Sequence, residues 1–359
     1  MTTYFLEAED VLFFRDGRPF NAGEDHHAAS RFPPAPSVIQ GVFRSHYLLQ
    51  QGIPLDDRTR IRQAVGDGED FKGLRLSAPL LARWEKDGRL TRFFPTPADA
   101  CVVKGDAEKD LIQPRRLIET AFTSLVDSGL KYLLAAPPEN EPEKGDVGAF
   151  LNEADFADYF FSAKPVKTAH HSELFEREAR LGIQLEGGSR STKDGMLYEA
   201  EFIRPCEGVG LLVEMDGLPG FPPSGVMRAG GEGRALRYRA VQPPSFTVKV
   251  GQAGQVLPET FKVYWVSPGW FEGGWKPQDW SVFFDGKVEV VAAAVAGYEV
   301  IGGYDLFEGK QKPASRWLPA GSVIYFRSEG GAVLKQAALT ERGAPIGYGQ
   351  IVIGEWKPG

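Results

Sequence analysis

Glycine and proline are frequent in this chain, with 42 glycines and 26 prolines among 359 residues. Glycine permits tight turns, and proline can neither continue a helix nor donate to a sheet, so short apolar runs between these residues are typical of strands and turns. The sequence therefore predicts many strands, not a helical bundle. Beyond a first strand at residues 4–14, strands are expected at residues 74–84, 131–134, 182–186, 196–203, 209–214, 261–266, 288–295, 322–327 and 350–355.

The clearest helix signal comes soon after the first strand. Residues 36–51 place apolar side chains at helical spacing, begin at Ser37 or the prolines beside it, and stop before Gly52. Between strand and helix, LFFRDGRPF displays Arg15 and Arg18 around an Asp-Gly turn. Local ion pairs that pin the turn are the simplest reading of these arginines, because surface ion pairs are common and contribute little.

The length of the chain predicts two domains, because one hydrophobic core rarely organises so many residues. A break at QPP, residues 242–244, divides the sequence into residues 1–241 and 242–359. Apolar residues make up 42% and charged residues 25%, no apolar run is long enough to span a bilayer, and MTTYFLEAED lacks the features of a signal peptide. Cys101 and Cys206 are too few for a disulfide framework or a four-thiolate metal site. A cytoplasmic protein with no membrane contact is expected.

The net charge of −7 argues at face value against a nucleic-acid partner, which usually needs a basic face. However, residues 137–158 contain seven acids and only Lys144 as a base, so 7 − 1 = 6 of the seven excess negative charges lie there. The proline-rich first part of this segment predicts a solvated loop. The rest of the chain is nearly neutral, so charge alone decides nothing.

Enzymatic motifs are scarce. GEG and GYG lack the third glycine of a dinucleotide fingerprint, and GYDLFEGKQ has neither the spacing nor the Ser or Thr of a phosphate loop. Adjacent histidines in a strand point to opposite sides and make poor metal ligands. These patterns give no reason to expect a cofactor or a metal, although the absence of a motif is not the absence of activity. His46 on the expected helix is the one histidine on a firm element that could serve as a general base, although a packed histidine is the simpler reading.

Two segments have unusual composition. Residues 182–203 read as a long hairpin whose polar, cationic tip is GGSRSTKDG, and such loops are more often functional than decorative. In MRAGGEGRALRYR, residues 227–239, glycines expose backbone N–H groups among four arginines, a combination that suits phosphate. The alternative, a glycine turn whose arginines pair with neighbouring acids, is equally compatible with this segment.

These segments together resemble a known family. FFRDGRPF, FPPAPSVIQGVFRS, REARLGIQLEGGSRSTKDGMLYEAEFIRP, AGGEGRALRY, YWVSPGWFEGGWKP, IGGYDLFEGKQKPASRWLPAGSVIYF and GAPIGYGQIVIGEW occur in that order over nearly the whole chain. The ordered set is similar to the third subunit of the Cmr complex of type III-B CRISPR systems. The acidic segment at residues 137–158, which we interpret as an insertion, and the short GYG motif depart from the family pattern.

The resemblance implies an α+β fold of two ferredoxin-like, RRM-related domains of the repeat-associated mysterious protein (RAMP) superfamily. Such a subunit is not catalytic. It holds the 5′ tag of the CRISPR RNA and joins the large polymerase and nuclease subunit to the first backbone subunit in antiviral defence. The hairpin at residues 182–203 corresponds to the family's thumb on the RNA.

Single-stranded RNA is held by phosphate contacts, backbone N–H groups and base stacking. The arginine turn, the helix start, the thumb and the glycine loop would supply these groups. The residues assigned to RNA are Arg15, Arg18, Arg31, Ser37, Arg44, Arg190, Lys193, Tyr198, Arg228, Gly230, Gly231, Gly233 and Arg234.

Two alternatives stay open. One is a metal-independent CRISPR endoribonuclease that uses His46, or His26 or His27, as its base, because relatives in the superfamily cut precursor RNA. The other is a pure protein scaffold, for which the aromatic residues of PGWFEGGWKPQDW, residues 268–280, are the best argument. Those aromatic residues more often pack locally.

Overall fold

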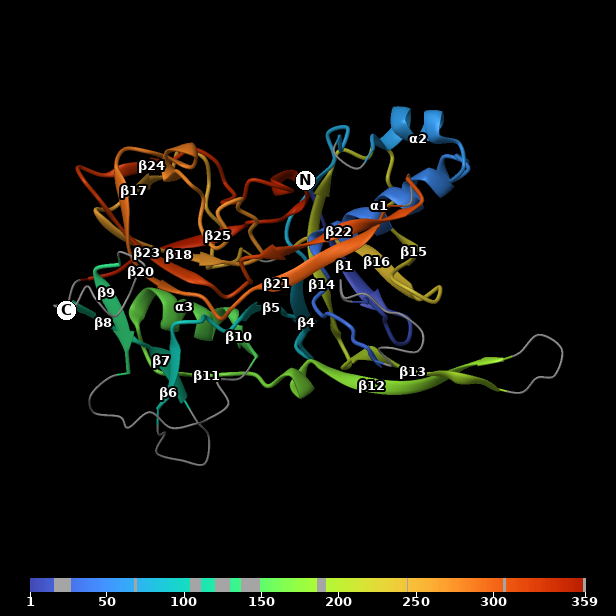
Figure 1. Cartoon of the computed structure of the whole chain (residues 1–359), viewed down its shortest axis with the longest axis horizontal. Helices are drawn as coiled ribbons and strands as arrows, with labels where there is room; N and C mark the ends of the chain where they lie inside the picture. Colours follow the sequence, from blue (N-terminus) through green and yellow to red (C-terminus); the bar gives the residue numbers. More distant parts are fainter. Residues whose placement is uncertain are drawn as a thin grey trace. The chain divides into compact units, whose positions relative to one another are not determined.

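The computed structural model describes residues 1–15, 27–67, 70–103, 111–119, 130–136, 149–185, 192–243, 245–305 and 308–357. Within these ranges the chain is mostly β, with few helices and many small sheets (Figure 1). This confirms the predicted abundance of strands. Two ferredoxin-like domains remain a prediction.

The chain forms two compact units, each assembled from three separate segments. The first contains Met1–Leu90, Ser172–Pro243 and Val300–Arg316, and the second contains Thr91–His171, Pro244–Glu299 and Trp317–Gly359. The predicted division at residues 241/242 differs from this arrangement, because the chain passes between the units at several further points. One junction, between Pro243 and Pro244, falls within the QPP break, whereas packing between segments distant in sequence sets the other four.

The first unit is built on an antiparallel sheet in which β1 lies between β14 and β16. Tyr4, Phe5 and Leu6 of β1 are all buried, as expected for a central strand that is covered on both faces. On one side the order continues through β14 to β4 and β3, and on the other through β16 to β15. The strands are β1 (Thr2–Ala8), β3 (Arg75–Leu76), β4 (Leu80–Trp84), β14 (Val209–Asp216), β15 (Ser224–Arg228) and β16 (Ala235–Val241).

Helix α1 (Pro36–Gln50) confirms the predicted helix. It begins with Pro36 in its first turn, where the missing N–H costs no hydrogen bond, and no side chain caps it. Phe43 is fully buried and packs edge to face on Tyr4 of the sheet, with ring centroids 5.8 Å apart. The short helix α2 (Arg58–Val65) follows.

Strand β1 is shorter than predicted. It ends at Ala8, and the exposed residues Glu9 and Asp10 form a bend. Two isolated bridges then hold the chain, one between Leu12 and Ile203 and one between Arg15 and Ser30. The segment that leads to Arg15 is therefore separated from the sheet by a bend, which the apolar composition of residues 11–14 concealed.

The predicted hairpin is longer at its base than expected. Strands β12 (Phe175–Leu185) and β13 (Thr192–Pro205) pair from Phe175 and Pro205 outward and form a long two-stranded arm (Figure 1). The short strand β2 (His27–Ala28) runs parallel to β13 near the base of the arm. Strands β21 (Glu299–Asp305) and β22 (Lys310–Trp317) pair as a second hairpin, and the 3-10 turn η1 (His171–Glu173) precedes β12.

The second unit is centred on a sheet in the order β20-β23-β18-β25. One face of β18 contributes Phe261 and Trp265 to a large aromatic core, and the other face directs Tyr264 toward α3, where its ring centroid lies 4.8 Å from that of Phe156. The main elements are α3 (Glu153–Ser162), β18 (Thr260–Trp265), β20 (Val288–Ala294), β23 (Val323–Ser328) and β25 (Ile351–Glu355).

Smaller pairings complete the second unit. Three strands pair in the order β17-β24-β19, three in the order β11-β7-β6, and two pairs are formed by β8 with β9 and β10 with β5. The elements are β5 (Leu90–Pro95), β6 (Ala100–Val103), β7 (Leu111–Pro114), β8 (Arg116–Glu119), β9 (Tyr132–Ala135), β10 (Phe150–Asn152), β11 (Val166–Lys167), β17 (Val256–Leu257), β19 (Phe284–Asp285), β24 (Ala332–Leu334), η2 (Trp280–Val282) and η3 (Ala344–Ile346).

The predicted acidic segment is only partly described. Residues 137–148, on which the loop prediction falls, lie outside the described residues. The remainder forms β10 and the first half of α3, where Glu153 pairs with the buried Arg92. In the part of the chain that the structure covers, no helix has both the length and the apolar character to cross a membrane.

Candidate nucleic-acid interface

Four of the segments singled out in the sequence meet in the first unit. The backbones of Leu12 and Ile203 exchange two hydrogen bonds of 2.8 Å, which fasten the segment after β1 to the base of the hairpin. Arg31 donates its N–H to the carbonyl of Phe14 at 2.9 Å, and Gly231 donates to the carbonyl of Phe13 at 2.8 Å. The segment from Leu12 to Arg15, the approach to α1, the hairpin base and the glycine loop therefore border one another.

The glycine loop packs against the backbone of the arginine segment. Gly230 has φ of +74°, and a Cβ at this position would lie 2.3 Å from the carbonyl oxygen of Phe13. A Cβ at Gly231 would lie 2.7 Å from the Phe13 ring. Glycine is thus required here for close approach between two chain segments. Because the N–H of Gly231 donates to the carbonyl of Phe13, it is not available to bind a ligand.

Arg234 ends this loop and is only 22% exposed. Its guanidinium lies 4.7 Å from the ring centroid of Phe202, a cation–π arrangement, and 3.6 Å and 3.5 Å from carboxylate oxygens of Asp10 and Glu232. Arg234 therefore pairs with neighbouring acids, which is the second of the two alternatives that the sequence allowed. The same holds for Arg237, which binds Glu9 through two hydrogen bonds of 2.9 Å and 3.0 Å.

A network of charged side chains surrounds this position. Arg204 donates to Glu178 at 2.8 Å and 3.0 Å and to Asp10 at 3.1 Å, and Arg180 donates to Glu178 at 2.7 Å. Arg180 and Arg204 lower the pKa of Glu178. The N–H of Val11, followed by Arg204, lowers the pKa of Asp10, and Glu178 and Asp10 raise the pKa of Arg204. We refer to Asp10, Glu178, Arg180, Arg204, Glu232 and Arg234 as the surface network.

The sequence reading missed Arg180, Arg204 and Arg177. Arg177 pairs with Glu201 and donates to the carbonyl of Ser30 at 3.1 Å, which ties the hairpin to the segment before α1. The available signal was the period-two spacing of charges in FEREARLG, which places Glu178 and Arg180 on one face of β12. Their partners on β13 required knowledge of the register.

The predicted residues Arg15, Arg31 and Ser37 lie in this region. Arg15 is exposed at its bridge with Ser30, Arg31 follows directly, and Ser37 lies in the first turn of α1. Arg228, the last residue of β15, is exposed beside the glycine loop, and Gly233 has φ of +65° within that loop. These positions are brought together by the fold, whereas their contact with RNA remains a prediction.

Other predicted residues are placed differently or not described. Arg44 donates to the backbone carbonyls of Gly66 and Asp67, both at 2.8 Å, so its guanidinium fastens the C-terminal end of α2. Burial lowers the pKa of Arg44. Arg18 and Arg190 lie outside the described residues. Lys193 and Tyr198 lie in β13, where the structure describes their backbone alone.

The residues that supported the alternative functions pack within the protein. His46 Nε2 lies 3.0 Å from Tyr238 Oη, the histidine ring packs against Phe221, and burial lowers its pKa. Phe271 is 2% exposed, and Trp275 and Trp280 are partly buried against the core of the second unit. Of the other histidines, His26 lies outside the described residues. His27 lies in β2, opposite Glu199 of β13. Among the described side chains, no cluster of three or more His, Cys, Asp or Glu is suited to a metal ion.

Comparison with known proteins gives one family. The family model described as CRISPR-associated protein (Cas_Cmr3) matches residues 4–356. No curated protein matches the sequence.

Three solved chains have similar structures. One belongs to the type III-B Cmr-beta bound to cognate target RNA and AMPPnP, with a TM-score of 0.47, 15% identity, and coverage of 90% of this chain and 86% of that chain. A second belongs to Cmr-beta bound to cognate target RNA, with a TM-score of 0.46, 16% identity and the same coverage. A third belongs to the Csm3-Csm4 subcomplex of a type III-A interference complex, with a TM-score of 0.38, 12% identity and full coverage of both chains.

Proposed function

Because the chain belongs to the Cas_Cmr3 family of CRISPR-associated proteins, we propose that it is the non-catalytic subunit that holds the 5′ tag of the CRISPR RNA in a cytoplasmic type III-B Cmr complex. The match over residues 4–356 confirms the resemblance carried by the ordered sequence motifs. As a member of this family the chain is a CRISPR effector subunit, and the tag-holding role is the specific proposal.

One observation carries the proposal. The segment ending at Arg15, the approach to α1, the glycine loop and the base of the β12–β13 arm meet around Phe13 and Phe14. Arginine forks bind phosphate oxygens in pairs, and a single-stranded RNA is held mainly through its phosphates and by stacking. A tag that follows this junction would meet Arg15 and Arg228 at its rim and the arm beside it.

The surface network fits this role despite the negative net charge. Its three arginines and three carboxylates are balanced, and its pairs are largely exposed, so each pair contributes little to stability. A backbone phosphate presents two charged oxygens to an arginine fork, as a carboxylate does, so it can take the place of a carboxylate. Binding would then need only a local exchange of partners, not a basic face.

We further propose that the subunit joins the large polymerase and nuclease subunit to the first backbone subunit. This part of the proposal comes from the family. Co-purification of the two neighbours through this chain tests it, and recovery of both neighbours together from cells that lack this chain would contradict it.

Photocrosslinking of the assembled complex tests the tag-holding role. With 4-thiouridine in the 5′ tag, we expect crosslinked peptides from residues 12–15, 228–234 or 192–203. The same label placed in the distant guide region serves as the control and should not yield these peptides. An intact complex whose tag crosslinks only to other subunits would refute the role.

A further inference from the structure

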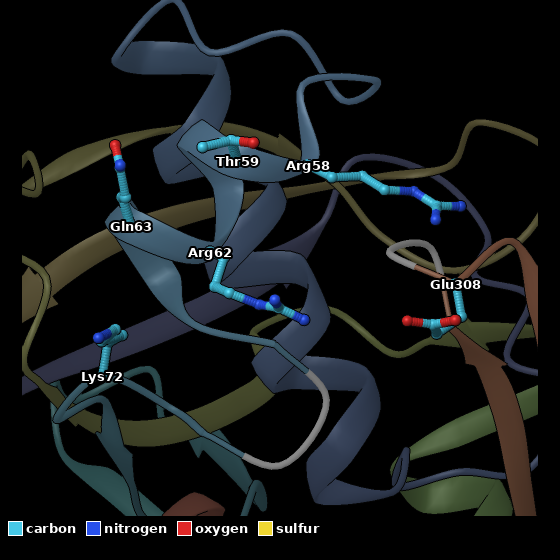
Figure 2. Close-up of a pocket in the computed structure, with 6 residues that line it drawn as sticks. All are labelled: Arg58, Thr59, Arg62, Gln63, Lys72 and Glu308. Atoms are coloured by element: carbon cyan, nitrogen blue, oxygen red, sulfur yellow. The ribbon is translucent and has the colours of Figure 1, made fainter.

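A second polar site lies beside α2 in the first unit. It is a surface depression of about 530 Å³, within the size range of ligand sites. All six residues that line it have polar or charged side chains. Its three cations outnumber its single carboxylate, which favours an anion. The lining residues are Arg58, Thr59, Arg62, Gln63, Lys72 and Glu308 (Figure 2).

Two of the cations are spaced for joint binding. Arg58 and Arg62 are four residues apart on α2, and such residues share one face of a helix. Figure 2 shows both guanidinium groups extending from the helix on the side where Glu308 lies. Like charges at this spacing repel each other in the empty site. An anion bound between them would replace this repulsion with two attractions.

Two ion pairs at this site are weak. Arg62 lies 3.5 Å from Asp67, and Lys72 lies 3.6 Å from Asp70, both longer than a good hydrogen bond. The side chains of Arg62 and Lys72 are 61% and 48% exposed, so water screens both pairs. A phosphate that replaced Asp67 or Asp70 in either pair would therefore give up little attraction.

The site is fixed in place by neighbouring contacts. Arg44 binds the carbonyls of Gly66 and Asp67 at the end of α2, and Asp57 accepts the N–H of Arg60 at its start. The N–H of Lys72 donates to Asp70 at 2.9 Å. Both ends of α2 and the backbone of Lys72 are therefore held by contacts within the protein, which lowers the entropic cost of binding.

We infer that this depression binds backbone phosphates of single-stranded RNA, as a contact that shares no residue with the tag site. Glu308 favours RNA over a free phosphate, because its carboxylate repels an isolated anion but can accept a hydrogen bond from a ribose 2′-hydroxyl. The inference rests on the proposed function, since the strand is the CRISPR RNA that the chain is proposed to hold.

The test uses the full-length chain and a fluorescent single-stranded CRISPR RNA, with affinity measured over a range of salt concentrations. The double variant Arg58→Gln and Arg62→Gln should bind about tenfold more weakly, and its salt slope should fall by about 1.4, or about 0.7 for each lost phosphate contact. Arg60→Gln is the matched control, because Arg60 lies on the same helix but pairs with Asp57 and does not line the site. Melting temperatures of both proteins confirm folding.

The outcomes separate this inference from the proposed function. Wild-type chain that binds no RNA would overturn both. Wild-type binding that the double variant reproduces, with the same salt slope, would overturn the α2 site alone. DNA of the same sequence, inorganic phosphate and ATP are added as competitors. Equal competition by DNA, or displacement by free phosphate or ATP at comparable concentrations, would reject RNA as the occupant, whereas preference for RNA that falls in Glu308→Ala supports it.

Discussion

Arginine and glutamate form two contrasting arrangements in this protein. In the second unit, Arg92 and Glu153 are 10% and 13% exposed, and Arg92 also donates to the carbonyl of Val248 at 2.8 Å. In the first unit, Arg204 and Glu178 of the surface network are 45% and 34% exposed. Glu153 in turn accepts the N–H of Val248 at 2.9 Å, whereas Arg204 divides its donors between two acids.

The difference in exposure between the two pairs indicates which arginines are available to a ligand. Arg92 lies over the ring of Phe246, 3.7 Å from its centroid, and breaking its pair would leave a charge without water. Arg180 and Arg204 of the surface network are 37% and 45% exposed, so they can exchange one anion for another. Similar side-chain chemistry therefore fastens a core in one region and offers a replaceable contact in the other.

The largest expected effect comes from breaking the buried pair. Arg92→Ala should lower the free energy of unfolding by about 3–5 kcal/mol, because Glu153 would keep a buried charge without its partner. Urea denaturation measures this loss. The control is Arg89→Ala, whose pair with Asp87 is highly exposed and should contribute little. Equal free energies of unfolding for the two variants would show that the buried pair stabilises the fold no more than the exposed pair does.

The next effect concerns the backbone beneath the surface network. Gly230→Ala should lower the free energy of unfolding by about 2–3 kcal/mol, because it combines positive φ with a clash against the Phe13 carbonyl. Gly233→Ala shares the positive φ but has open space around its Cβ, so it should cost less. Thermal denaturation compares the pair, and a larger loss in Gly233→Ala would mean that the two segments do not approach closely.

If RNA phosphates replace carboxylates at these arginines, removing an arginine should weaken RNA binding and change the stability of the fold little. Arg15→Ala, Arg18→Ala and Arg234→Ala should each weaken capture of tagged CRISPR RNA by about 1–3 kcal/mol, the range for a charge-assisted hydrogen bond. Each loss should also reduce the salt dependence of binding, since fewer counterions are released.

These three variants also test the opposite interpretation. Arginines that only pin turns would lower the melting temperature and leave RNA affinity and its salt slope unchanged. Arg234 contacts Phe202, Asp10 and Glu232 within the protein, so the melting temperature of its variant is especially informative. Reduced stability with unchanged affinity would remove these residues from the tag site and leave the family assignment intact.

The smallest expected effect concerns the acidic residues within 137–147, which belong neither to the buried pair nor to the surface network. Replacing residues 137–147 with a short Gly-Ser linker should leave solubility and assembly nearly unchanged, because the sequence there is charged and proline-rich. Expression level and co-purification with the other subunits measure this. Insoluble protein would show that the stretch is a structural element.

Local sequence signals predicted the elements well where packing and propensity agree. Pro36 and the apolar spacing after it gave α1, and the short apolar run at residues 261–266 gave β18. The strand predicted at residues 4–14 was too long, because the bend at Glu9 and Asp10 follows from contacts with the hairpin base. Such contacts join residues almost two hundred positions apart and leave no local signal.

The candidate site shows what a sequence can say of segments and of single residues. The segment ending at Arg15, the glycine loop and the hairpin base lie together, and their contact with RNA stays a prediction, whereas Arg44 binds backbone carbonyls and Arg234 pairs with Asp10. An arginine looks the same in sequence whether it meets a carboxylate, a carbonyl or a phosphate. Its partner is fixed only when the strands are in register.

The interleaving of the two units has a consequence for synthesis of the protein. Six segments are joined at five junctions, and the first unit requires Val300–Arg316 while the second requires residues up to the C-terminal segment. A ribosome therefore releases almost the whole chain before either unit has all its strands, and domain-by-domain folding during translation is not available. The nascent chain must keep unpaired strand edges apart until then. Expression of either half alone should give aggregates, and chaperone capacity should limit its yield in cells.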